Sequence, residues 1–187
     1  MNKKIILIRH AKPIIDYYSK CNFRQCRKII FDYNSSPNLS FDIDESTMNF
    51  LTSLNGTVFS SDMTRTKLTA SFLFKEKNLK VDKVFREFDL DVLNIPLVKM
   101  RFNNWLAVSR IFWFCNLIKN TRMPKDEIKR AAEATSILIN HQKQEDNVIL
   151  VGHGMINHYI SKNLKKDGWK LHKKIGKGYL GIKIYEK

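Results

Sequence analysis

The sequence predicts an α/β protein, a three-layer α/β/α sandwich around a mainly parallel sheet. Short runs of β-branched and other apolar residues alternate with longer segments of helical periodicity, which is typical of strands and helices following one another. The length of 187 residues suits one compact domain. Because no internal repeat or linker rich in proline and glycine divides the chain, we expect residues 1–187 to form a single domain.

The elements follow from these patterns in chain order. The expected strands are residues 4–8, 57–60, 81–85, 147–151 and 180–185. The expected helices are residues 43–54, 64–75, 102–119, 126–141 and 155–164. Pro124 lies just before the fourth helix, as is common at a helix start. In such sheets ligands bind beyond the carboxyl ends of the strands, so polar residues there are candidates for a site.

The chain is strongly basic, with 33 Lys and Arg against 18 Asp and Glu and a formal net charge of +15. This charge favours anionic partners such as phosphorylated metabolites, nucleic acid or acidic lipid. No recognised nucleic-acid motif accompanies the charge, so a nucleic-acid partner is not favoured. The lysine clusters at 162–166 and 170–174 are expected to be solvated surface.

The cysteines and the N-terminus indicate where the protein works. Cys21, Cys26 and Cys115 are odd in number and lack the paired spacing of a zinc site, so we expect free thiols in a reducing compartment and infer no metal or other cofactor. The first residues do not form a signal-peptide core, which favours a cytoplasmic protein. The apolar stretch 105–118 is too short to span a bilayer, and Arg110 interrupts it.

Two basic groups follow the first two strands. Arg9 and His10 come directly after the apolar run 4–8, so both side chains are expected at the carboxyl edge of the sheet. Arg65 falls in the first turn of the helix that follows strand 57–60. A cation is unfavourable at a helix N-terminus because the helix dipole is already positive there. An anion bound between Arg65 and the helix end would resolve this conflict.

Two further strands end in polar residues. His153 lies between Gly152 and Gly154 where an apolar strand gives way to a helix, and flanking glycines allow a ligand to approach the backbone closely. Glu87 follows the expected strand 81–85 among apolar neighbours. An apolar setting can raise the pKa of a carboxyl group toward neutrality, so Glu87 is the candidate general acid.

Together, these residues match the requirements of phosphoryl transfer. A neutral imidazole can attack phosphorus, guanidinium groups complement the phosphoryl oxygens, and a carboxylic acid protonates the leaving oxygen. Asp89 and Asp91 lie close to Glu87 in the sequence and are alternatives for the acid.

The motifs resemble those of the histidine phosphatase superfamily, which has the phosphoglycerate mutase-like fold. Its Arg-His-Gly signature appears as Arg9, His10 and Ala11. Its Ser-x-x-x-Arg-x-x-x-Thr-Ala element appears at 61–70, its Val-x-His-Gly element at 151–154 and its acid-bearing segment at 86–89. The matches keep the family's order and extend from about residue 5 to about residue 160.

Three positions depart from the family pattern. Ala11 replaces the usual glycine, and a small effect on the backbone is expected. Asp16 lies near the place of a small polar residue that often binds phosphate, and it is not assigned a role. The segment after Glu87 lacks the Gly-x-x-Glu-Gly pattern of many relatives, which leaves Asp89 and Asp91 open as alternatives.

The resemblance implies a metal-independent phosphatase that passes through a phosphohistidine on His10, with Glu87 as the acid. It implies phosphate binding by Arg9, His10, Arg65, His153 and Gly154. The substrate would be a phosphorylated small molecule or a phosphoprotein. Three alternatives remain open: a catalytically inactive module that binds a phosphorylated ligand, a phosphoglycerate mutase-type enzyme and, less favoured, a nucleic-acid-binding protein.

Residues 92–123 correspond to an insertion that largely sets specificity in mutase-like relatives. The apolar helix expected within it is a candidate lid, hydrophobic wall or membrane-facing patch. Its bulky apolar side chains and its cations would suit an amphipathic phosphorylated substrate or an anionic bilayer. The cations are Arg101, Arg110, Lys119 and Arg122.

Overall fold

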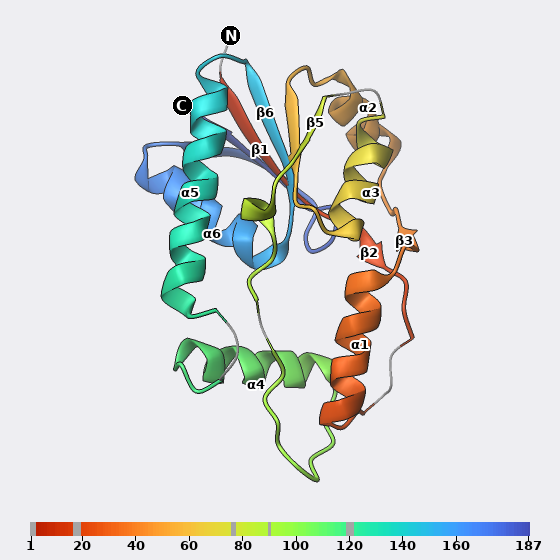
Figure 1. Ribbon diagram of the computed structural model, residues 1–187. Coiled ribbons are helices and arrows are strands. Elements are labelled where there is room, and N and C mark those ends of the chain that lie inside the picture. Colours follow the sequence, from red (N-terminus) through yellow and green to blue (C-terminus); the bar gives the residue numbers. More distant parts are fainter. Residues whose placement is uncertain (1–2, 17–19, 76–77, 90, 119–121) are drawn as a thin grey trace.

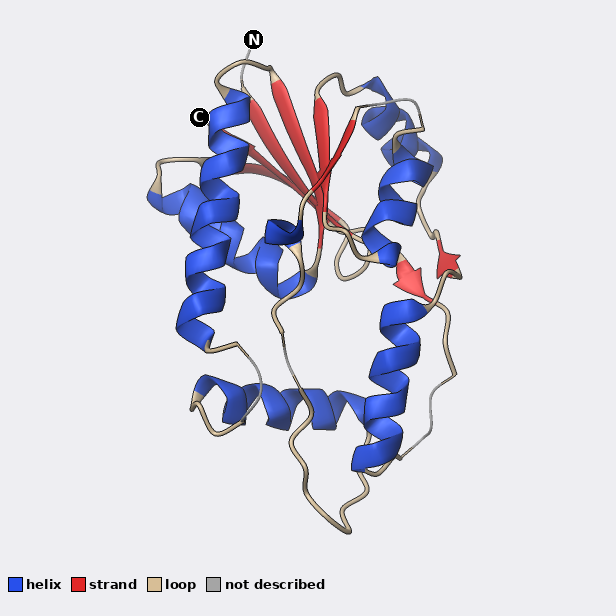
Figure 2. Ribbon diagram, viewed as in Figure 1, coloured by secondary structure: helices blue, strands red, loops and turns tan. Residues whose placement is uncertain are grey.

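The computed structural model describes residues 3–16, 20–75, 78–89, 91–118 and 122–187. Its main sheet consists of β1 (Lys4–Arg9), β4 (Thr57–Ser60), β5 (Leu79–Val81), β6 (Asn147–Gly152), β7 (Lys170–Ile175) and β8 (Ile182–Glu186). The strand order is β5-β4-β6-β1-β8-β7, in which the first four strands are parallel and the last two are antiparallel to their neighbours. A small second sheet pairs β2 (Lys12–Pro13) with β3 (Leu39–Ser40). The expected mainly parallel sheet is confirmed (Figure 2).

Helices cover both faces of the sheet. The helices are α1 (Phe23–Ser35), α2 (Glu45–Ser53), α3 (Thr64–Leu73), α4 (Phe102–Phe114), α5 (Pro124–Gln142) and α6 (Gly154–Lys166), with a 3-10 turn η1 (Lys83–Phe85). On β1, Ile5 and Leu7 pack with the cluster that includes α5 and α6. Ile6 and Ile8 point to the other face and pack with α2 and α3. This alternation, which the two-residue period of a strand requires, produces the three layers seen in Figure 1.

Helices α1 and α4 lie beyond the carboxyl edge of the sheet (Figure 1). They pack on each other through a small separate core that contains Cys26, Ile29 and Trp105. The indole Nε1 of Trp105 donates to the carbonyl oxygen of Cys21 at 2.7 Å, which fixes the start of α4 against the segment before α1. The two helices therefore form an outer wall that faces the strand ends.

Some sequence expectations were wrong. Residues 81–85 do not form a strand: β5 ends at Val81, and the carboxylate of Asp82 accepts a hydrogen bond from the Val84 N–H at 2.9 Å and starts the 3-10 turn. Helix α4 ends at Phe114 rather than continuing to 119, because Asn116 adopts a positive φ of 57°. Lys119 itself lies outside the described residues.

Other expectations concern the thiols and the membrane. All three cysteines are free, with Cys21 and Cys26 buried and Cys115 exposed, as the sequence predicts. Within the described ranges, no helix has both the length and the apolar character needed to cross a bilayer.

Candidate active site

The carboxyl ends of β1 and β6 place His10 and His153 side by side. These strands are parallel neighbours, and the His10 N–H donates to the carbonyl oxygen of Gly152 at 3.0 Å. The two imidazole rings meet edge to face with centroids 5.1 Å apart. Both side chains are buried, with 2 % of His10 and 0 % of His153 exposed. Two histidines far apart in the sequence therefore form one buried polar pair at the carboxyl edge of the sheet.

The hydrogen bonds of His10 define its tautomer. Nδ1 lies 2.7 Å from the carbonyl oxygen of Ala11, which can only accept, so Nδ1 carries the proton and Nε2 carries the lone pair. The Nε–H of Arg65 donates to that Nε2 at 3.2 Å, and the hydroxyl of Tyr33 lies 3.3 Å from it. Burial, reinforced by the charge of Arg65, lowers the pKa of His10 to about 3. His10 is therefore a neutral imidazole whose Nε2 lone pair accepts from Arg65, and a neutral imidazole can act as a nucleophile at phosphorus once that lone pair is released.

Arg65 occupies the first turn of α3 and points inward. It is 3 % exposed, and besides His10 it donates to the side-chain oxygen of Asn34 at 2.8 Å. Its guanidinium carbon lies 4.9 Å from the centre of the Tyr33 ring, which is cation–π geometry. Both of these partners lie on α1, for which the sequence analysis predicted neither a helix nor site residues.

His153 is oriented by the start of α3. Its Nε2 lies 2.8 Å from the hydroxyl of Ser61, which in turn lies 2.7 Å from the hydroxyl of Thr66. Its Nδ1 is buried and has no hydrogen-bond partner among the described residues. Burial, together with the nearby charge of Arg65, holds the pKa of His153 well below its ordinary value. A second neutral imidazole thus lies beside His10.

Arg9 lies against the ring of Tyr179. Its guanidinium carbon lies 4.2 Å from the centre of the Tyr179 ring, and the ring of Tyr179 is 5.6 Å from that of His10. Within the described part of the chain, the buried Nε of Arg9 has no hydrogen-bond partner. The Nε–H of Arg9 is therefore suited to bind an anion, because it is held in place near other basic groups and has no partner of its own.

Glu87 is fixed at the N-terminus of α6. Its Oε1 accepts from the N–H groups of Met155 at 3.0 Å and Ile156 at 3.1 Å. Its Oε2 shares the Met155 N–H at 3.1 Å and lies on the side of Gly154, where a Cβ atom would be 3.5 Å from Oε2 and 3.7 Å from the guanidinium carbon of Arg9. Gly154 thus lies next to both the carboxylate and Arg9, and a Cβ atom there would be in ordinary van der Waals contact with both.

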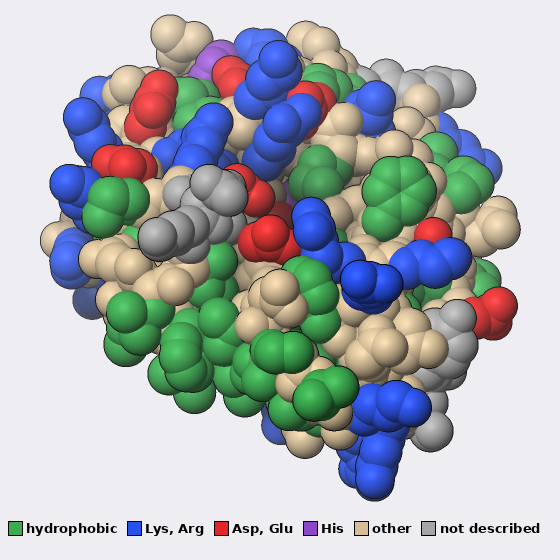
Figure 3. Space-filling model, turned by 60° about the horizontal axis from the view of Figure 1, so that its bottom comes forward, with side chains coloured by type: hydrophobic (Ala, Val, Ile, Leu, Met, Phe, Trp, Pro, Cys, Tyr) green, Lys and Arg blue, Asp and Glu red, His purple; other side chains and the backbone are tan. Residues whose placement is uncertain are grey.

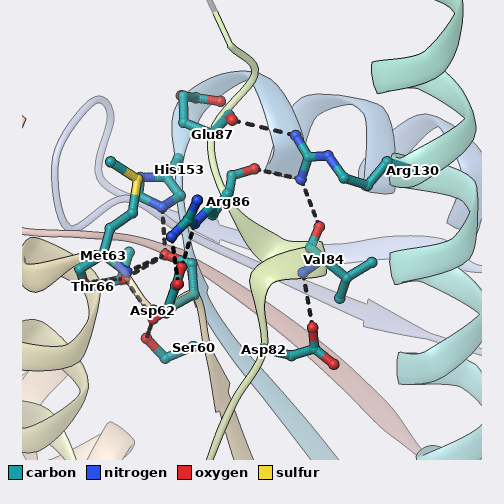
Figure 4. Close-up of polar contacts among 11 residues, drawn as sticks. Ser60, Asp62, Met63, Thr66, Asp82, Val84, Arg86, Glu87, Arg130 and His153 are labelled. Carbon is teal, nitrogen blue, oxygen red and sulfur yellow. Dashed lines mark hydrogen bonds and ion pairs between the residues drawn. The ribbon is translucent and has the colours of Figure 1, made fainter. Parts of the chain in front are cut away.

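Arg130 on α5 holds the backbone that presents Glu87. It donates to the carbonyl oxygens of Val84 at 2.7 Å, Arg86 at 2.8 Å and Glu87 at 3.3 Å (Figure 4). The same guanidinium is paired with Glu127, whose side chain is 1 % exposed. These bonds fix the direction in which the chain leaves the 3-10 turn.

The other two candidate acids lie differently. Asp91 is 3.6 Å from Arg27 in an ion pair and does not line the cavity beside Arg9. Asp89 lines that cavity but is exposed. Of the three carboxylates that the sequence left open, Glu87 is the one held against the strand-end cluster.

Ala11 fits the site without strain. It is fully buried, its N–H donates to the hydroxyl of Thr69 at 3.0 Å, and it is not among the described residues with positive φ. The backbone there needs no glycine, which agrees with the small effect expected for this departure.

A large cavity borders this cluster, and its lining includes Arg9, Arg65 and Glu87 but neither His10 nor His153. Its volume is about 1350 Å³, which exceeds the usual range for small-molecule pockets of roughly 300–1,000 Å³. One side is formed by Arg9, Arg65 and Glu87, and the opposite side by α4. Figure 3 shows this side of the molecule, with basic and acidic side chains around a hollow and hydrophobic side chains gathered next to it.

Sequence reasoning missed four residues of the site. Tyr33 and Asn34 contact His10 or Arg65, Tyr179 covers Arg9, and Ser61 orients His153. Ser61 belongs to a recognised motif and was the one most open to prediction. Within the described residues, no group of three or more His, Cys, Asp or Glu side chains is arranged to hold a metal ion.

The site and the fold agree with comparisons to known proteins. Residues 48–186 match the family model of the histidine phosphatase superfamily (branch 1), and the chain belongs to this family. The match includes Arg65, Glu87 and His153 but begins after Arg9 and His10. The structure therefore supplies independent evidence that the first strand contributes to the same site. No curated protein sequence matches the chain.

Several solved structures share the fold. Phosphoglycerate mutase from Bacillus anthracis is similar with a TM-score of 0.59 at 18 % identity, covering 98 % of this chain and 87 % of that one. The Rv3214 protein from Mycobacterium tuberculosis has a TM-score of 0.59 at 13 % identity, covering 100 % and 95 %. Phosphoserine phosphatase from Entamoeba histolytica has a TM-score of 0.52 at 13 % identity, covering 97 % and 89 %. The chain thus has the phosphoglycerate mutase-like fold.

Proposed function

We propose that the protein is a phosphatase that hydrolyses a phosphomonoester through a phosphohistidine on His10, without a metal ion. The observation that supports this most strongly is the state of His10: its Nδ1–H is bound to a carbonyl oxygen, and its Nε2 lone pair faces Arg65. A buried neutral imidazole, two arginines and a carboxyl group at one strand edge are suited to phosphoryl transfer.

In the first step, Nε2 of His10 attacks phosphorus. The P–N bond forms while the ester P–O bond breaks, and the leaving oxygen takes a proton from the carboxyl group of Glu87. Oε2 is the better placed oxygen to hold that proton, because Oε1 accepts from three main-chain N–H groups whereas Oε2 only shares that of Met155. The phosphoryl oxygens are bound by Arg9 and Arg65, whose charges stabilise the transition state.

In the second step, water attacks the phosphohistidine. The carboxylate of Glu87 takes a proton from the water, the P–N bond breaks and inorganic phosphate is released. His10 returns to its original tautomer, with the proton on Nδ1. His153 donates to a phosphoryl oxygen in both steps through its Nδ1 when that nitrogen bears the proton and Nε2 accepts from Ser61. The hydroxyl of Tyr33 and the Nε of Arg65 must move from Nε2 before phosphorus can reach it.

The test is hydrolysis of p-nitrophenyl phosphate in the presence of EDTA. The wild type should turn over and form a phosphorylated protein whose label is labile in acid and stable in base. His10→Ala should lose at least about 10³-fold in kcat/KM and all labelling, since the nucleophile is removed. His158→Ala removes an exposed histidine of α6 and is the matched control, with activity like the wild type.

Other outcomes identify the alternatives. Binding of phosphorylated ligands without turnover or labelling would indicate an inactive binding module. Transfer of the phosphoryl group from His10 to a second phosphoglycerate, rather than to water, would indicate a mutase. Activity that survives in His10→Ala would refute the mechanism.

A further inference from the structure

Helix α4 presents one face to the cavity that Arg9, Arg65 and Glu87 of the candidate site also line. Phe102, Leu106 and Arg110 follow one another at intervals of four residues and all line the cavity, as neighbours on one helix face should. Trp113 continues the same face, and its indole Nε1 donates to the carbonyl oxygen of Arg122 at 2.9 Å. At a rise of about 1.5 Å per residue, the face from Phe102 to Arg110 is about 12 Å long.

The lining of the cavity has an excess of positive charge. Nine Lys and Arg residues line it, against six Asp and Glu residues. Several of these charges neutralise each other: Arg86 is paired with Asp62, and Arg130 with Glu127. Among the acids, Asp89 and Glu133 are exposed and form no ion pair within the described ranges.

We call the side of α4 that lines the cavity the α4 wall. Its cations are Arg101, at the start of the helix, and Arg110, and they are not neutralised in this way. Within the part of the chain that the structure describes, neither Arg101 nor Arg110 takes part in an ion pair. Both are exposed and line the cavity together with apolar side chains from α4. Two available guanidinium groups beside an apolar surface are suited to a ligand that is apolar in part and anionic at its end.

We propose that the substrate has two acidic groups separated by an apolar segment. The phosphoryl group would bind at Arg9, Arg65 and His10, the apolar segment would lie on Phe102 and Leu106, and the second anion would bind Arg110. Arg101 adds charge at the start of the same helix. This inference rests on the proposed function, because it takes the phosphate pocket as the place of the reacting phosphoryl group.

Binding of non-hydrolysable phosphonates tests the second anion site separately from the proposed hydrolysis. The probes are alkylphosphonates of increasing chain length that end in a carboxylate, a second phosphonate or an uncharged carboxamide, with affinities measured by calorimetry. At the best length, an acidic end should improve the Kd at least about tenfold over the carboxamide, as expected for a charge-assisted pair. The carboxylate and phosphonate arms show which anion is preferred.

Variants identify the second anion site. Arg110→Gln should abolish the gain from the acidic end, and Arg110→Lys should retain part of it because the positive charge remains. Arg24→Gln, which removes an exposed arginine outside the cavity, is the matched control and should keep the full gain. Circular dichroism checks that each variant is folded.

The outcomes separate failure of this inference from failure of the proposed function. If an acidic end gives no gain at any length, or if the gain survives in Arg110→Gln, the second anion site is refuted while hydrolysis of p-nitrophenyl phosphate by the wild type still supports the proposed function. If the gain depends on Arg110 but His10 is never phosphorylated, only the proposed chemistry is refuted. If no phosphonate binds, the second anion site is refuted, and the proposed function is judged by hydrolysis of p-nitrophenyl phosphate and by labelling of His10.

Discussion

The carboxyl edge of the sheet and the α4 wall face the same cavity and are built in opposite ways. At the sheet edge His10, Arg65 and His153 are at most 3 % exposed and are linked by hydrogen bonds to one another or to neighbouring side chains. On α4 the charged side chain of Arg110 is exposed, and no ion pair holds it among the described residues. Fixed groups suit a reaction common to many phosphate esters, whereas an adaptable wall suits selection among them.

Glu87 gives the largest effect with which to test this contrast. Glu87→Gln should lower kcat for p-nitrophenyl phosphate by about 10²–10⁴-fold, because the amide can neither deliver a proton to the leaving oxygen nor take one from the water that attacks the phosphohistidine. Asp89→Asn, at an exposed carboxylate of the same cavity, is the matched control and should stay close to wild-type activity. A large loss in Asp89→Asn with little loss in Glu87→Gln would reassign the acid.

The buried imidazoles should make folding sensitive to acid. Burial lowers the pKa of His10 from 6.5 to about 3, so the unfolded chain binds a proton more readily than the folded one below pH 6.5. The stability that depends on neutral His10 is therefore full above pH 6.5 and is lost as the pH falls toward 3. The loss approaches about 1.4 kcal/mol per pH unit for each such group.

Urea unfolding between pH 7 and pH 5, in buffers without phosphate, measures this effect. His10→Asn should reduce the dependence of the unfolding free energy on pH, and His172→Asn, at an exposed histidine of β7, is the control. Curves for His10→Asn and the wild type that run parallel would show that His10 is not buried in its neutral form.

The outward surface of α4 should give the smallest effect on the fold. Ile111 and Phe114 on α4, and Leu117 just beyond its end, are 63 %, 43 % and 62 % exposed, on a chain with a net charge of +15. Replacing Ile111 and Leu117, the two most exposed of these, by Ser should change the unfolding free energy by no more than about 0.5 kcal/mol. We expect the same double variant to bind anionic phospholipid vesicles several-fold more weakly in a flotation assay, since less apolar surface can enter the interface. Equal flotation of both proteins would exclude a membrane role for this surface.

The sequence predicts the central strands of the sheet better than its edge strands. Apolar runs such as 147–151 and the polar residues that follow them identify the central strands and the places of His10 and His153, because a buried strand needs an uninterrupted apolar pattern. Strand β7 escaped prediction because its lysines resemble a solvated surface, and it is indeed an exposed edge strand on which lysines oppose further pairing. Local sequence patterns therefore identify the polar residues at the ends of central strands more readily than they identify the edge strands.

Helix α1 is the most consequential omission. Its side chains Tyr33 and Asn34 reach the site through packing of α1 beyond the sheet edge, which no local pattern specifies. One local signal was present: Asn22 and Gln25 form a capping box, with bonds of 2.9 and 3.0 Å between each side chain and the other's N–H. That signal predicts where the helix starts but not that its last turn approaches His10.

The position of β1 has a consequence for how the pocket is assembled during synthesis. The strand that ends in Arg9 is made well before its neighbours in the sheet, β6 and β8, where Ile8 is paired with Val151 and Ile182. Such non-local pairing delays folding, because a long stretch of chain must be ordered before these contacts can form. A nascent chain that has not yet reached β6 contains His10 and Arg65 but lacks the strand beside His10. The cluster of His10, Arg65 and His153 therefore assembles only after residues 147–186 have emerged.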